Sequence, residues 1–225
     1  MKSKPVEELV NKDDPGWPLV EEWLEKATNH YEVLPADKNR AQKALTDTQV
    51  TTRSPMGAII YHTGGILVDH CWIRILGSGC NKLPRSLPEW NKGKTVKKAG
   101  MQPTFLLVAD DVIGGFFAVN GGGLGKELGD IYYFAPDTLE WESLEISYSD
   151  FLNWCFKGDL NTFYQDFRWT NWQQEVESLN GDQVFVFYPS LFTKAESMEN
   201  RNRKKASINE VYKMYAGHLE GSERR

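Results

Sequence analysis

The chain has 225 residues and a formal net charge of −5, from 26 lysines and arginines against 31 aspartates and glutamates. This length suits one large domain or two small ones, and an aromatic content of 12% argues against disorder. The acidic balance excludes a general nucleic-acid-binding surface, which requires clustered cations. No apolar run reaches the roughly 20 residues that a membrane helix needs.

The N-terminal residues and the cysteines indicate the cellular compartment and the redox state of the protein. Residues 1–8 are charged and lack the apolar stretch of a signal peptide. The three cysteines, Cys71, Cys80 and Cys155, form no C-x-x-C pair. We therefore expect a cytoplasmic protein with no disulfide framework, no metal and no cofactor.

Helices are predicted throughout the first 62 residues. One begins near Pro18 and has its apolar face on Leu19, Val20, Trp23, Leu24 and Ala27. A second, with a thin apolar stripe, covers residues 35–45 and is expected to be peripheral. A third begins at Ser54-Pro55 and is stopped by Gly64-Gly65.

Strands dominate the middle of the chain, and residues 81–100 are predicted to form a surface loop. Alternating or continuous apolar residues predict strands at 66–68, 71–76, 104–109, 112–119, 131–135 and 139–147. A helix capped by Ser147 or Ser149 follows and ends at Gly158. Short turns between the strands are typical of an antiparallel meander.

The C-terminal third is predicted to hold a hairpin and a helix. Strands at 176–179 and 184–188 would flank a type I′ turn at Asn180-Gly181. The last helix begins near Ser207, with Glu210 completing a capping box. Its apolar stripe comprises Ile208, Val211, Tyr212, Tyr215 and Leu219.

Together these elements predict an α+β fold with a central, mainly antiparallel sheet and flanking helices. We expect a single domain, residues 1–225, with a helical N-terminal part (1–50), a sheet-containing core (54–190) and a C-terminal helix and tail (200–225).

Two motifs in the meander are candidates for a binding site. Asp110 and Asp111 could form a carboxylate pair for acid–base chemistry or a divalent cation, or they could be solvated turn residues, which we favour. The loop Gly121–Gly125 after Asn120 lacks the spacing and the Ser or Thr of a phosphate-binding loop, so its glycines are expected to serve backbone conformation. A small-molecule pocket near both motifs is the alternative.

A second group of residues has side chains that can bind metals, but its spacing does not favour a metal site. His62, Asp69, His70 and Cys71 include three consecutive residues, and neighbours on a strand point to opposite faces. A two-ligand corner from His62 and His70 is one hypothesis, and ordinary core or surface histidines are the favoured alternative.

Charge and aromatic residues suggest surfaces for partners. Residues 104–165 carry ten acidic residues against two lysines, and Asp130, Glu140, Glu142 and Glu145 are candidate contacts for a basic protein, with ordinary solvated faces as the alternative. Residues 201–205 are basic and are interpreted as a solvated linker. The aromatic stretch 154–172 is expected to be core, with homo-oligomerisation as the alternative.

Several strings of residues resemble a known family. They include Gly64–Asp69 with Trp72–Gly79, Ala109–Gly122, and Gly129–Asp137 with Tyr148–Leu152. Over most of the chain these resemble a bacterial family described as a domain of unknown function. Residues 104–158 also resemble, more distantly, the SUKH superfamily, which implies a SUKH-like sheet and a role like that of toxin-neutralising immunity proteins.

No intact catalytic motif accompanies these features, such as a G-x-S-x-G elbow or an H-E-x-x-H helix. We therefore expect a non-enzymatic protein-binding module. A small-molecule-binding protein or enzyme with a pocket near Asp110, Asp111 and Gly121–Gly125 is the second hypothesis.

Overall fold

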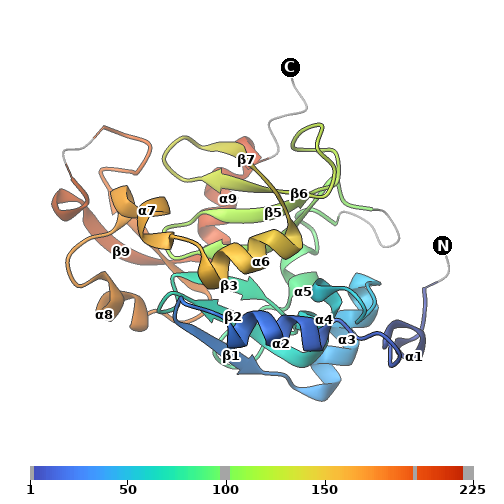
Figure 1. Ribbon diagram of the computed structural model, residues 1–225. Coiled ribbons are helices and arrows are strands. Elements are labelled where there is room, and N and C mark those ends of the chain that lie inside the picture. The colour runs from blue at the N-terminus through green and yellow to red at the C-terminus, as the bar shows by residue number, and fades with distance from the viewer. Residues whose placement is uncertain (1–2, 97–101, 195–196, 220–225) are drawn as a thin grey trace.

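The computed structural model describes residues 3–96, 102–194 and 197–219. A seven-stranded sheet forms its centre, and each strand pairs antiparallel with the next in the chain. These strands are β1 (Tyr31–Pro35), β2 (Thr63–Val68), β3 (Ile73–Leu76), β4 (Phe105–Asp111), β5 (Phe116–Asn120), β6 (Asp130–Ala135) and β7 (Glu140–Ser147). In Figure 1 they rise from β1 to β7. The predicted α+β fold with an antiparallel meander is confirmed.

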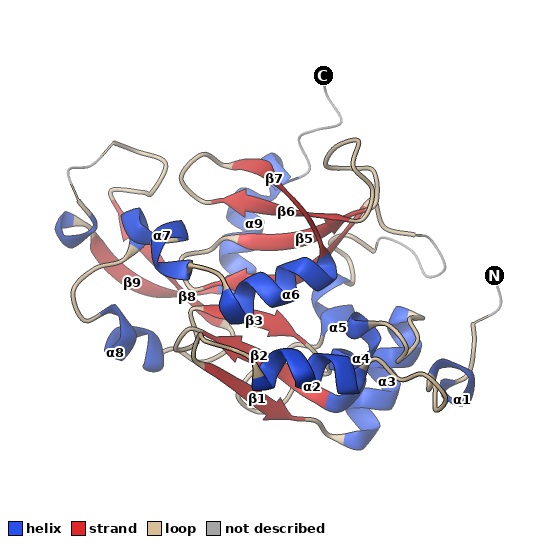
Figure 2. Ribbon diagram, viewed as in Figure 1, coloured by secondary structure: helices blue, strands red, loops and turns tan. Residues whose placement is uncertain are grey.

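A second sheet consists of β8 (Gln183–Tyr188) and β9 (Asn202–Ser207), paired antiparallel at one side of the molecule (Figure 2). The predicted hairpin at Asn180-Gly181 is therefore wrong. Residues 172–177 form a helix instead of a strand, and β8 pairs with the basic segment that we interpreted as a linker. Arg203 in that segment forms an ion pair with Glu175, which compensates its charge. Its guanidinium group lies over the Trp169 ring.

The helices cover both faces of the main sheet. They are α1 (Val6–Leu9), α2 (Trp17–Glu25), α3 (Lys38–Thr48), α4 (Pro55–His62), α5 (Leu87–Asn91), α6 (Tyr148–Lys157), α7 (Leu160–Phe163), α8 (Trp172–Glu177) and α9 (Ile208–Leu219), with short 3-10 turns at Gln165–Phe167 and Met198–Asn200. In Figure 1, α6 lies in front of the sheet and α9 behind it. None of the helices in the described part of the chain has the length and apolar character to cross a membrane.

Apolar side chains that point alternately to the two faces of the sheet form a hydrophobic core on each face. Phe117 contacts Phe151 of α6, whereas its neighbour Phe116 contacts Tyr212 of α9. Successive strand residues point to opposite faces, so each of these phenylalanines anchors one layer of helices. Trp169 and Tyr164 are also buried, which confirms a core role for much of the aromatic stretch 154–172.

Local signals account for most helix ends. The side chains of Ser54 and Ser147 accept hydrogen bonds from Gly57 N and Asp150 N, which confirms the predicted starts of α4 and α6. The Ser207 hydroxyl accepts from Asn209 N, and Ser207 N donates to Glu210, as expected for the start of α9. The Leu219 side chain, expected on the apolar stripe of that helix, lies outside the described residues.

Three other expectations were wrong in detail. Residues 31–35 form the edge strand β1, although the first third was expected to be helical. Helix α4 ends at His62 with Thr63 as its C-cap, so Gly64 and Gly65 follow the helix end but lie inside β2 and do not cap the helix. The predicted loop 81–100 contains helix α5, which begins with a Ser86–Glu89 capping box. Residues 97–100 of the predicted loop lie outside the described part of the chain.

Candidate functional site

A buried ion-pair network lies where the main sheet meets the β8–β9 hairpin. Asp110, at the end of β4, is completely buried between two arginines. Arg74 of β3 reaches one carboxylate oxygen, with Nε at 2.6 Å, and Arg85 reaches the other. Burial lowers the pKa of the Arg74 guanidinium, and the Asp110 carboxylate opposes that effect. The solvated-turn interpretation of Asp110 is therefore wrong.

The same arginines hold the hairpin in place. Arg74 Nη1 donates to the carbonyl oxygen of Gln183 at 2.5 Å. Arg85 Nη1 donates to the Gly181 carbonyl and to the Asp182 carboxylate, the latter at 2.6 Å. Charge-assisted hydrogen bonds of this kind are about twice as strong as neutral ones. The network therefore joins segments that are far apart in the sequence.

Asp111 is also fully buried, but within the described residues its carboxylate forms no ion pair, and Arg74 Nη2 reaches only its backbone carbonyl, at 3.3 Å. One carboxylate oxygen accepts from the backbone N–H groups of Ile113 and Gly115, at 3.1 and 2.8 Å. The other accepts from the hydroxyls of Tyr133 and Tyr164, at 2.7 and 3.1 Å. Burial raises the pKa of Asp111 to about 6, although each of these hydrogen bonds acts in the opposite direction. Asp111 therefore titrates near neutrality, beneath the protein surface.

Gly115 makes this arrangement sterically feasible. A β-carbon at this position would lie 2.4 Å from the Tyr133 hydroxyl and 2.5 Å from an Asp111 carboxylate oxygen. The turn between β4 and β5 can thus approach the carboxylate only because residue 115 lacks a side chain.

A pocket of about 310 Å³ opens beside this network. Its walls come from the segment around α5, the turn before β8 and the start of α9, and comprise Pro84, Arg85, Glu89, Trp90, Lys94, Asp182, Ser207, Ile208 and Asn209. The Arg85 guanidinium carbon lies 5.1 Å from the centre of the Trp90 ring, and Lys94 Nζ lies 4.0 Å from it. One N–H of Arg85 and one of Trp90, Nε and Nε1, are buried and have no hydrogen-bond partner among the residues that the structure describes.

The loop after β5 does not belong to this pocket. Asn120 pairs with Phe105 at one end of the β4–β5 pair, whereas Asp110 pairs with Phe116 at the other. The structure therefore does not bring Asp110 and Asp111 together with Gly121–Gly125.

Asn120 instead organises its own loop. Its amide nitrogen donates to the carbonyls of Gly125 and Glu127, and its amide oxygen accepts from Gly122 N and Leu124 N. Gly122 has a φ of 105°, the backbone conformation expected of a glycine in this loop.

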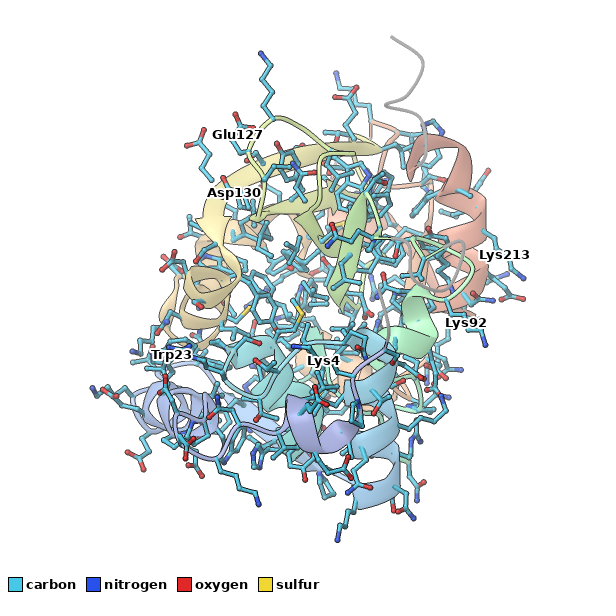
Figure 3. The ribbon with its side chains drawn as sticks, turned by 90° about the vertical axis from the view of Figure 1, so that its right-hand side faces the viewer. Lys4, Trp23, Lys92, Glu127, Asp130 and Lys213 are labelled. Atoms are coloured by element: carbon cyan, nitrogen blue, oxygen red, sulfur yellow. The ribbon has the colours of Figure 1, made fainter. Side chains whose placement is uncertain are left out.

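The acidic candidates lie on other surfaces. Glu140, Glu142 and Glu145 are exposed on β7, the edge strand of the sheet. Asp130 is half-buried at the start of β6, and Figure 3 shows it beside Glu127, away from Lys92 and Lys213. Asp110 and Asp111 add nothing to this acidic surface because they are buried.

His62 and His70, the two histidines considered as metal ligands, have different ring partners. His62 stacks on Trp17 with ring centres 4.9 Å apart, and His70 stacks on His30 at 4.5 Å. In residues 3–96, 102–194 and 197–219, no group of three or more His, Cys, Asp or Glu side chains could hold a metal ion. Asp69, His70 and Cys71 all have positive φ, so they form a turn between β2 and β3 rather than part of a strand.

Sequence reasoning missed the cations of the site. Arg74 lies within an apolar strand, where a lone charged residue signals a buried partner. The capping box around Ser86 could have located α5, and with it Arg85 and Trp90. No local signal places Lys94 opposite the start of α9.

A family model described as "Protein of unknown function DUF2625" matches residues 6–211. The chain belongs to the DUF2625 family. It is 48% identical over 209 residues to "Putative uncharacterized protein YbfG" of Escherichia coli, which covers 93% of this chain and 94% of the relative. It is 45% identical over 208 residues to an "Uncharacterized protein" of Haemophilus influenzae, covering 92% of this chain and 91% of the relative. The resemblance to a domain-of-unknown-function family is confirmed, and these two bacterial relatives align over more than nine-tenths of the chain.

Proposed function

We propose that this DUF2625 protein is a non-enzymatic binding module that holds a small molecule in the pocket between α5 and α9. The observation that carries the proposal is the pocket itself, which combines the Trp90 ring with the charged side chains of Arg85 and Lys94. Small-molecule sites typically join aromatic walls to a few placed polar groups.

The state of the two aspartates supports binding rather than catalysis. Both oxygens of Asp110 contact arginines, and both oxygens of Asp111 accept two hydrogen bonds each. A general base must reach the proton that it abstracts from a substrate. Two fully buried carboxylates with these contacts are arranged to stabilise the fold.

A pocket-blocking variant tests the proposal. We expect Asn209→Trp, at the mouth of the pocket, to abolish the rise in Tm that a bound compound produces, because the indole would fill the space. The measurement is a thermal-shift screen of anionic, cationic and neutral metabolites on the full chain. Met214→Trp, on the exposed side of the same helix, is the control and should retain the shifts. Shifts that survive in Asn209→Trp, or no shift with any compound, would contradict the proposal.

A partner protein is the second candidate, favoured by the edge strand β7. One edge of this strand pairs with β6, and it carries the exposed side chains of Glu140, Glu142 and Glu145. A free edge can accept a strand from another chain, and the glutamates would favour a basic one. The immunity-like role implied by the SUKH resemblance would use such a surface and stays a prediction.

Reversing the charge of the β7 glutamates tests whether this strand binds a partner protein or is simply exposed to solvent. We expect a stoichiometric basic partner, recovered by pull-down at moderate salt, to be lost when Glu140, Glu142 and Glu145 are all changed to Lys. The matched control reverses three exposed glutamates of α2, Glu21, Glu22 and Glu25, and should retain the partner. Equal recovery with both triple variants would exclude β7 as the docking strand.

A further inference from the structure

The pocket holds one cation without a counter-ion. Lys94 is half-buried, and its Nζ lies 4.0 Å from the centre of the Trp90 ring and 5.3 Å from that of Tyr212. Burial, Arg85 and Lys213 each lower the pKa of the Lys94 ammonium group. Within the described residues, no carboxylate forms an ion pair with Lys94. Figure 3 shows that Lys92 and Lys213 add further positive charge to this side of the molecule.

The two carboxylates of the pocket already have cationic partners. Asp182 pairs with Arg85 at 2.6 Å. Glu89 lies 3.4 Å from Arg40 and accepts hydrogen bonds from the backbone and hydroxyl of Ser86. The positive charge of Lys94 is therefore the surplus charge of the pocket.

The start of α9 adds to this positive potential. The N-terminal end of a helix carries a partial positive charge, and α9 has 12 residues. Its first N–H groups are already used, since Ile208 N donates to Asp182 O and Asn209 N donates to the Ser207 hydroxyl. These two N–H groups therefore do not face a ligand, and the helix adds to the positive potential through its dipole beside Lys94.

We propose that the ligand of this pocket is a small oxyanion, carrying a carboxylate or a phosphate group, with Lys94 as its principal cation. This inference rests on the proposed function and names the ligand class. Arg85, fixed by Asp110 and Asp182, orients the adjoining wall. Oxyanions supply acceptor oxygens for the N–H donors of the Lys94 ammonium group, which lines the pocket.

The test is isothermal titration calorimetry of the full chain with sodium phosphate and, separately, sodium acetate, at constant ionic strength set with chloride. We expect saturable binding of at least one anion, weakened at least tenfold in Lys94→Met. Lys94→Arg keeps the charge and should bind within threefold of the original protein. Lys126→Met removes an exposed lysine of the loop after β5, which does not belong to the pocket, and should bind unchanged. Binding of phosphate alone identifies a phosphate ligand, and binding of acetate alone identifies a carboxylate.

Two results would overturn the inference: neither anion binds, or Lys94→Met and Lys94→Arg bind as tightly as the original protein. A different result separates the two proposals. If a neutral or cationic compound raises the Tm of the original protein but not that of Asn209→Trp, while neither anion binds, the pocket is a binding site and only the proposed ligand class is wrong. Melting temperatures of all variants show that the comparison is between folded proteins. If Lys94→Met does not fold, Lys94→Gln, which also removes the charge, replaces it and should weaken binding at least tenfold.

Discussion

Replacing Asp110 with alanine is expected to lower the free energy of unfolding by about 3–5 kcal/mol, the usual cost of leaving a buried charge without its partner. The variant would leave two guanidinium groups, Arg74 and Arg85, in the interior without the carboxylate between them. Urea denaturation at pH 7, followed by tryptophan fluorescence, measures the loss.

The control for this variant is the other carboxylate that contacts Arg85. The side chain of Asp182 is 45% exposed, so Asp182→Ala is expected to cost no more than about 1 kcal/mol. A loss of less than 1 kcal/mol for Asp110→Ala would show that water compensates the two arginines. A double variant, Asp110→Ala with Arg74→Met, should recover part of the stability because it removes one of the unpaired charges.

The contribution of Asp111 to the free energy of unfolding should fall as the pH rises from 4 to 7. Its pKa is raised from 3.8 to about 6 in the folded protein, so the folded state holds a proton that the unfolded state releases. The contribution is fully present below pH 3.8 and is lost as the pH passes 6, with an amplitude on the order of 3 kcal/mol. Asp111→Asn cannot titrate, so the difference in unfolding free energy between this variant and the original protein isolates the effect.

Tyr133→Phe provides a directional check on this assignment. The Tyr133 hydroxyl donates to Asp111 and lowers the pKa of the carboxyl group. Its removal should move the pH-dependent loss of stability to a higher pH. A curve that is unchanged in Asp111→Asn, or that moves to a lower pH in Tyr133→Phe, would contradict the assignment.

The sequence predicted the elements whose signals are local. Strands β4 to β7 and helix α6 have clear alternation, short turns and the Ser147 and Gly158 ends, and all five appear near their expected positions. The pairing of β8 with β9 escaped prediction because its partners are separated by a helical turn and a loop, while Asn180-Gly181 is a strong local hairpin signal. The side chains of β9 are mostly polar, which resembles a linker when its partner strand is unknown.

The candidate site was predicted only in part. The Asp110-Asp111 pair was singled out, but their burial depends on Arg74 and Arg85, which are 36 and 25 residues from Asp110 in the chain. A single sequence cannot show such long-range ion pairs. The pocket likewise combines three separate segments, so none of its walls is visible as a motif.

The contacts of Arg74 and Arg85 with the Gln183 and Gly181 carbonyls join parts of the chain that are synthesised at different times. When residues up to 147 have left the ribosome, the seven-stranded sheet and the Asp110 ion pairs have all of their residues available. The hairpin and α9 are synthesised after the residues of the main sheet. A nascent chain that ends before residue 181 lacks the Gly181 and Gln183 carbonyls, so Arg74 and Arg85 cannot yet make these two hydrogen bonds.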